Sequence, residues 1–128
     1  MKRLIALILV VVLTVSALSI CVFAASNSKS GKYKSRNYYG VISCSDTAAT
    51  GSMRWEGTQY NVKCRVTLYS HNRKEGTTRI RMITSAPQQN YASIPVTVDT
   101  GCVADYADFD GIIGDVDIIC KLQAYPGR

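Results

Sequence analysis

His71 is the only histidine in this 128-residue sequence, so its surroundings bear on whether the chain could be a catalyst. It lies in the polar segment 70–77, SHNRKEGT, with no second histidine to share a metal ion or to complete an acid–base pair. Pairs of aspartates can cleave glycosidic bonds, but no cluster of aromatic side chains lies near the aspartates to hold a sugar. The sequence therefore predicts no enzyme, no catalytic residue and no cofactor.

Carboxylates gather in residues 105–117, DYADFDGIIGDVD, which partly match the pattern of a calcium-binding loop. If Gly111 is the turn glycine, three aspartates fall at ligand positions, but Tyr106 occupies the first position, where a carboxylate is required. The flanking residues favour strands and not the helices of an EF-hand. A calcium site of another kind remains an alternative to a solvated acidic loop, and no metal ligand is assigned.

Positive charge is densest in residues 60–84, YNVKCRVTLYSHNRKEGTTRIRMIT. Apolar and basic residues alternate there, which predicts a long β-hairpin with one apolar face and one cationic face. Ile80 and Met82 are expected on the apolar face. The predicted binding residues are the basic side chains of the two strands and of the 70–77 loop: Lys63, Arg65, Arg73, Lys74, Arg79 and Arg81.

Like charges on neighbouring strands repel each other, so this cationic face needs compensation by water and salt, by nearby aspartates or by an anionic partner. Residues 25–98 carry 11 basic and 3 acidic side chains, whereas residues 99–128 carry 2 basic and 6 acidic ones. The expected partner is a cell-wall polymer, a layer of lipid headgroups or an acidic protein surface, and the 105–117 segment of a second copy could give self-association. Nucleic acid is not expected, because no aromatic platform is interleaved with the basic residues.

The first residues have the composition of a bacterial-style export signal. A basic start, Met1-Lys2-Arg3, precedes a long apolar run that ends in small residues. Residues 1–24 are therefore predicted to be a signal peptide that is cut between Ala24 and Ala25. The alternative is an uncut apolar segment that spans a membrane. The protein is expected to be secreted, either into the medium or onto the cell envelope.

Four cysteines follow the predicted signal peptide, and an even number in an exported chain predicts two disulfides. Three pairings are possible. The spacing favours bonds between neighbours, because each would close a loop of about twenty residues. The predicted disulfide residues are Cys44 with Cys64 and Cys102 with Cys120.

About seven short strands and no helix are predicted after the signal peptide. Residues 25–37 are polar and basic, and are expected to form a flexible linker. Residues 38–128 are expected to form a single disulfide-stapled all-β domain, an antiparallel β-sandwich of the immunoglobulin-like or a similar kind, with a small barrel as the alternative. Trp55, the only tryptophan, is expected in its core.

These patterns favour a secreted, non-enzymatic binding module that uses the cationic face of the hairpin. The alternative is a secreted effector, either an antibacterial protein or a hydrolase inhibitor whose 70–77 loop inserts into a target. A cationic exported β-sandwich resembles, in outline, the lactococcin-972-like bacteriocins, but no motif carries individual residues across.

Overall fold

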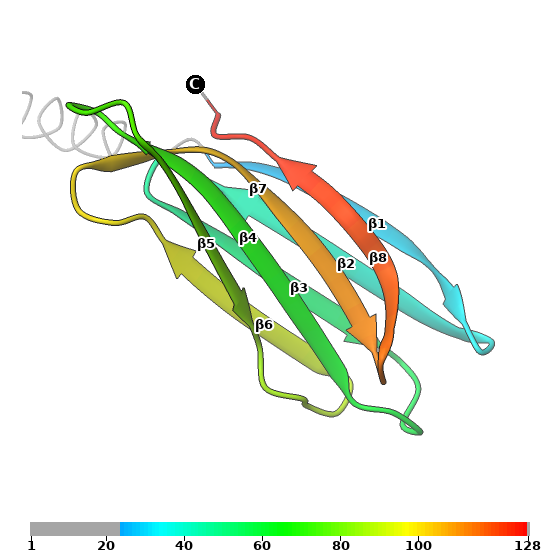
Figure 1. The fold of residues 1–128 in the computed structure, drawn as a ribbon. Coiled ribbons are helices and arrows are strands. Elements are labelled where there is room, and N and C mark those ends of the chain that lie inside the picture. Colours follow the sequence, from blue (N-terminus) through cyan, green and yellow to red (C-terminus); the bar gives the residue numbers. More distant parts are fainter. Residues whose placement is uncertain (1–23, 128) are drawn as a thin grey trace, which may run out of the picture.

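The computed structural model describes residues 24–127, which form eight β-strands and no helix (Figure 1). The predicted signal peptide falls on residues 1–23, outside the described residues, apart from Ala24. The strands are β1 (Ala25–Tyr33), β2 (Arg36–Cys44), β3 (Ala48–Trp55), β4 (Val62–Asn72), β5 (Thr78–Thr84), β6 (Tyr91–Thr97), β7 (Cys102–Ile113) and β8 (Val116–Ala124).

The strands form two four-stranded antiparallel sheets, one in the order β1-β2-β3-β6 and the other in the order β5-β4-β7-β8. The prediction of an all-β fold is therefore confirmed. Figure 1 shows the two sheets as two layers, and within residues 24–127 no continuous ladder joins them into a barrel. The order also differs from that of a constant-type immunoglobulin domain, in which the fifth strand and not the third lies next to the second.

The core lies between the sheets, where every second side chain of β3 and β4 is buried. Trp55 is 1% exposed, which confirms its predicted place in the core. Phe109 of β7 fills the centre of this layer. A Cβ atom on Gly51 would lie 2.6 Å from the Phe109 ring, and one on Gly40 would lie 2.9 Å from it. The two glycines of the opposite sheet thus leave the space that the ring occupies.

The two sheets also meet along the edge formed by β1 and β8. The side-chain amide of Asn27 donates a hydrogen bond to the backbone carbonyl of Gln123 at 3.0 Å. An antiparallel bridge joins Ala24 to Pro126 at the same edge. Because of these contacts, the first and last described strands cover part of each other's free edge.

Residues 25–37 are not a linker in the structure, which differs here from the prediction. Ala25–Tyr33 is strand β1, and it pairs with β2 along its whole length. Lys34 and Ser35 form the two-residue turn between them with φ angles of 48° and 62°. Positive φ at both turn residues is the geometry of the tight hairpin turn that matches strand twist. The exposed lysines belong to an edge strand, where charge discourages pairing with other chains.

The acidic segment 105–117 is not a loop either. Most of it lies in β7, and the chain reverses at Gly114 and Asp115 before β8 begins. At the centre of β8, Ile119 is fully buried and Cys120 is exposed. The pairing of β8 with β7 shifts register beside Lys121, whose φ is 50°. This bulge reverses which side chains of β8 face the core.

Neither predicted disulfide is present among the described residues. Cys102 begins β7, whereas Cys120 follows Ile119, the partner of Gly111 near the other end of β7. At about 3.3 Å per residue, these two cysteines lie roughly 25 Å apart along the strands, whereas a disulfide needs Cα atoms within about 7 Å. Cys64 Sγ instead lies 3.6 Å from the carbonyl oxygen of Gly51.

Candidate functional site

The predicted hairpin is confirmed as strands β4 and β5, which pair from Arg65–Thr84 to His71–Thr78 without a register shift. The buried side of β4 alternates with a half-buried side along the whole strand. The turn is shorter than the predicted loop of residues 70–77, because β4 continues to Asn72 and Ser70 is buried.

The six predicted binding residues do not share one face. Residues directly opposite each other in an antiparallel pair point to the same side of the sheet. Arg81 is paired with Leu68, and Leu68 is buried in the core. Arg79 and Arg81 therefore point to the inner side of the sheet, whereas Lys63 and Arg65 point to its outer side, so the prediction of a single cationic face was wrong.

The basic side chains on the outer face are matched by carboxylates. Arg65 contacts Asp110 of β7, with 3.4 Å between Nη1 and Oδ2, and Lys63 contacts Asp115 at 3.7 Å. Asp110 also accepts a hydrogen bond from the backbone N–H of Lys121 at 2.9 Å, so its second oxygen holds the bulge of β8. The positive charge of this face is thus compensated within the molecule.

Arg81 is also matched, although it lies on the edge strand. Its guanidinium donates to the backbone carbonyl of Thr97 at 3.3 Å and lies 3.7 Å from a carboxylate oxygen of Asp99. Thr97 ends β6 in the other sheet, so Arg81 bridges the two sheets along their open edge. This arginine therefore joins the two layers.

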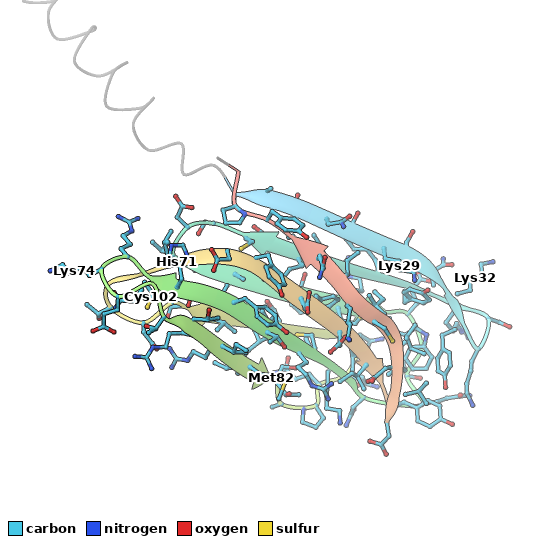
Figure 2. The ribbon with its side chains drawn as sticks, turned by 45° about the horizontal axis from the view of Figure 1, so that its top comes forward. Lys29, Lys32, His71, Lys74, Met82 and Cys102 are labelled. Atoms are coloured by element: carbon cyan, nitrogen blue, oxygen red, sulfur yellow. The ribbon has the colours of Figure 1, made fainter. Side chains whose placement is uncertain are left out.

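Arg73, Lys74 and Arg79 form what we call the cationic hairpin end. All three side chains are exposed, and within residues 24–127 none of them forms an ion pair with a carboxylate. Glu75 lies in the same turn and is contacted by the Thr77 hydroxyl at 3.5 Å. Figure 2 shows Lys74 at the tip of the hairpin, with Lys29 and Lys32 toward the other end of the molecule.

The backbone of this turn is held by Asn72. Its side-chain oxygen accepts hydrogen bonds from the N–H groups of Lys74 and Glu75 at 2.9 and 3.0 Å. Its backbone groups bond to Thr77 and to Gly76, which has a φ of 69°. Asn accepts local hydrogen bonds of this kind and Gly adopts positive φ without strain. Arg73 and Lys74 therefore extend from a fixed turn, and Arg79 extends from the strand that follows it.

A row of tyrosines crosses the outer face of the same sheet. The rings of Tyr69 and Tyr106 stack with centroids 4.4 Å apart, and Tyr125 lies 5.8 Å beyond Tyr106. Burial raises the pKa of the Tyr69 phenol, and the charge of Asp108 raises it further. Ile80 and Met82 of β5 continue this face, and at 64% and 63% exposure they contradict the predicted apolar inner face of that strand.

His71 lies beside a carboxylate of β7. Its Nδ1 lies 2.7 Å from a carboxylate oxygen of Asp105, at the end of the outer face. No group of three or more potential ligands in residues 24–127 is arranged to hold a metal ion. Asp105, Asp108 and Asp110 lie in strand β7, so the calcium-loop pattern of the sequence does not become a loop in space.

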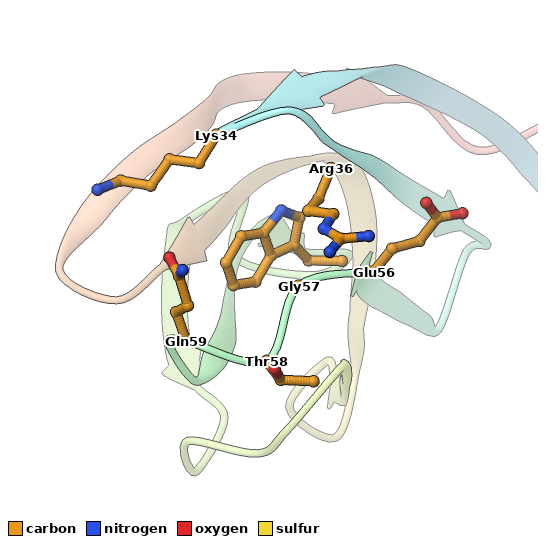
Figure 3. Close-up of a pocket in the computed structure, with 7 residues that line it drawn as sticks. Lys34, Arg36, Glu56, Gly57, Thr58 and Gln59 are labelled. Atoms are coloured by element: carbon orange, nitrogen blue, oxygen red, sulfur yellow. The ribbon is translucent and has the colours of Figure 1, made fainter.

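A small pocket of about 180 Å³ (Figure 3) lies beside the turn between β1 and β2, at the opposite end of the molecule from the β4–β5 turn (Figure 1). Its charged lining residues are Lys34, Arg36 and Glu56. The Lys34 ammonium donates to the Tyr60 hydroxyl at 3.2 Å, and this hydrogen bond raises the pKa of the lysine. Sequence reasoning missed this pocket because the turn at Lys34 brings together residues that have no shared motif.

Comparison of the chain with protein-family models, curated proteins and solved structures finds no match. Residues 24–127 also contain no helix that is long and apolar enough to cross a membrane.

Proposed function

We propose that this protein is an exported, non-enzymatic binding module, a β-sandwich that attaches to an anionic surface through the cationic hairpin end. One contrast carries the proposal. Lys63, Arg65 and Arg81 each lie beside an aspartate, whereas Arg73, Lys74 and Arg79 have no carboxylate partner within the described residues.

Unpaired cations on a fixed turn suit an anionic partner for two reasons. Their charge is not already neutralised within the molecule, so the full Coulomb attraction is available to the partner. The turn is held by the hydrogen bonds of Asn72, so little backbone freedom is lost when the partner binds. Export would bring this surface to wall polymers and lipid headgroups.

Retention on a polyanionic matrix across a salt series tests the proposal. The test variant is R73Q/K74Q/R79Q, and the matched control is K29Q/K32Q/R36Q, which removes the same charge from the opposite end. At about 1 kcal/mol per cation near an anionic surface, the test variant should bind roughly 100-fold more weakly at low salt. Wild-type binding should fade as the Debye length falls toward 8 Å at physiological salt.

The control should keep most of the wild-type affinity, because its net charge equals that of the test variant. Equal losses in both variants would show attraction to the whole molecule and would overturn the assignment to the hairpin end. No retention of the wild-type protein at low salt would overturn the proposed function.

The same fixed turn supports a second candidate, a secreted effector such as an antibacterial protein or an inhibitor that inserts residues 73–77 into a target. Binding of this kind depends on shape more than on charge, so it should persist at high salt. It should also fail when Asn72→Ala releases the turn, whereas salt-sensitive attachment to a polyanion should persist in that variant.

A further inference from the structure

Strand β5 has an unusual surface for the edge of a two-layered protein. Every residue from Thr78 to Met82 is exposed, on both sides of the strand. Ile80 and Met82 project together from the outer side, two residues apart, and each is more exposed than any other large hydrophobic side chain of the described residues. Single exposed apolar residues are ordinary, but two adjacent aliphatic side chains beside a row of tyrosines form a continuous apolar surface.

The apolar pair lies beside the unpaired cations. Arg79 precedes Ile80 in the same strand and projects from the other side of it, and the turn with Arg73 and Lys74 continues the strand at its end. Figure 2 shows Met82 along the edge that leads to Lys74. One edge of the molecule therefore presents aliphatic side chains, tyrosines and cations together.

This combination separates two kinds of anionic surface. A hydrated polymer such as a wall polyanion would use the cations and gain nothing from Ile80 and Met82. The interface of an anionic bilayer uses both, because the headgroups attract the cations while the acyl boundary takes up apolar side chains. Tyrosines also favour this interface, since the ring is apolar and the hydroxyl is polar.

We propose that the anionic surface is a lipid bilayer and that Ile80 and Met82 enter its headgroup layer while Arg73, Lys74 and Arg79 contact lipid phosphates. This inference rests on the proposed function and names its partner. The insertion is shallow, because the outer backbone edge of β5 has no strand partner among residues 24–127. Its N–H and C=O groups need the water and headgroups of the interface and would be left without partners in hydrocarbon.

Binding to two surfaces tests the inference. The first is a vesicle made of phosphatidylcholine and phosphatidylglycerol in equal parts, and the second is the lipid-free polyanionic matrix. The test variant is I80S/M82S, and the control is Y39S/V116S, which removes two other exposed apolar side chains. The test variant should bind the vesicles about tenfold more weakly than wild type and should bind the matrix equally well. The control should match wild type on both surfaces.

A Met82→Trp variant gives a second measurement that does not depend on affinity. Lipids brominated near the headgroup end of the acyl chain should quench its fluorescence, whereas the buried Trp55 of the wild-type protein should not be quenched. Equal vesicle binding by I80S/M82S and wild type, or no quenching at position 82, would overturn the bilayer inference.

The two proposals can fail separately. If wild type binds the matrix through its hairpin cations but I80S/M82S binds vesicles as well as wild type does, the bilayer inference falls and the anionic-surface function stands. If wild type binds neither surface at low salt, both fall.

Discussion

The outer face of β4 and the end of the β4–β5 hairpin contain the same kinds of basic side chain, only a few residues apart, and use them differently. On the face, β7 lies alongside and supplies Asp110 next to Arg65. At the turn, β7 reaches only as far as Cys102, opposite Asn72, and no strand of the described residues supplies a carboxylate to Lys74. The role of a basic side chain therefore depends on its position in the sheet. Where a neighbouring strand supplies a carboxylate, the cation forms an ion pair, and where none does, its charge remains available to a partner.

The largest effect should follow from removing Asp110, the carboxylate that pairs with Arg65 on the outer face of β4. Asp110→Ala leaves Arg65 half-buried without its partner and leaves the Lys121 N–H in the bulge unsatisfied. We expect a loss of about 2 kcal/mol in the free energy of unfolding. Urea denaturation checks this value. Asp115→Ala, which removes a fully exposed partner of Lys63, should change stability by less than about 0.5 kcal/mol.

A smaller effect should follow from converting a paired cation into an unpaired one. Asp99→Asn removes the carboxylate beside Arg81, which lies on the same strand as Arg79. The extra free charge should strengthen binding to the polyanionic matrix by roughly fivefold, since each cation near an anionic surface contributes about 1 kcal/mol. Unchanged retention at low salt would mean that the edge of β5 lies outside the binding surface.

The face should also differ from the hairpin end in its response to pH. The pKa of Tyr69 is raised above its unfolded value of about 10 by burial and by Asp108, so the fold favours the protonated phenol. The stability from this group is fully present below pH 10 and is lost as the pH rises through the folded pKa. Asp108→Asn should lower the pKa of Tyr69, and NMR titration of tyrosine ring carbons would detect the shift. If the pKa of Tyr69 is the same in wild type and in Asp108→Asn, the assigned effect of Asp108 on Tyr69 is wrong.

The smallest effect should be on the folding stability of the variant that lacks the three cations of the hairpin end, although this variant should lose most of the binding. R73Q/K74Q/R79Q removes three exposed side chains that have no ion-pair partner among the described residues. Its free energy of unfolding should stay within about 0.5 kcal/mol of wild type. Thermal denaturation beside the binding assay checks this. A destabilisation of more than 2 kcal/mol would show that the hairpin end has a structural role.

The strands with strong alternation could be predicted from the sequence, and β4 is the clearest case. Its buried positions follow one another at every second residue, because both the opposite sheet and β7 enforce the register. The placement of Trp55 in the core followed from its size and apolar surface. The sequence could not show that β7 is one long strand. Its aspartates suggest a loop, and only the fold shows that basic side chains of β4 lie beside them.

The candidate site was predicted only in part, and β5 shows why. An edge strand is not covered on its inner side, so its apolar residues are not forced inward, and the turn sets its register instead. Strand β1 was not predicted because the turn that follows it has no local sequence signal. Lys34 and Ser35 lack the glycine or asparagine that usually marks a tight hairpin turn. The bulge at Lys121 depends on Asp110 of another strand, which no local pattern reveals.

The contact between β1 and β8 has a consequence for how the chain reaches its final structure. Asn27 and Gln123 are 96 residues apart in sequence, yet their hydrogen bond covers one edge of the molecule. The β1–β2 hairpin can form early because its contacts are local, but its outer edge stays open until the last strand is in place. A chain that leaves a translocation channel from its N-terminus would therefore expose this edge until its final residues emerge. Truncation after β7 should then give a product that associates through β1 and does not fold alone.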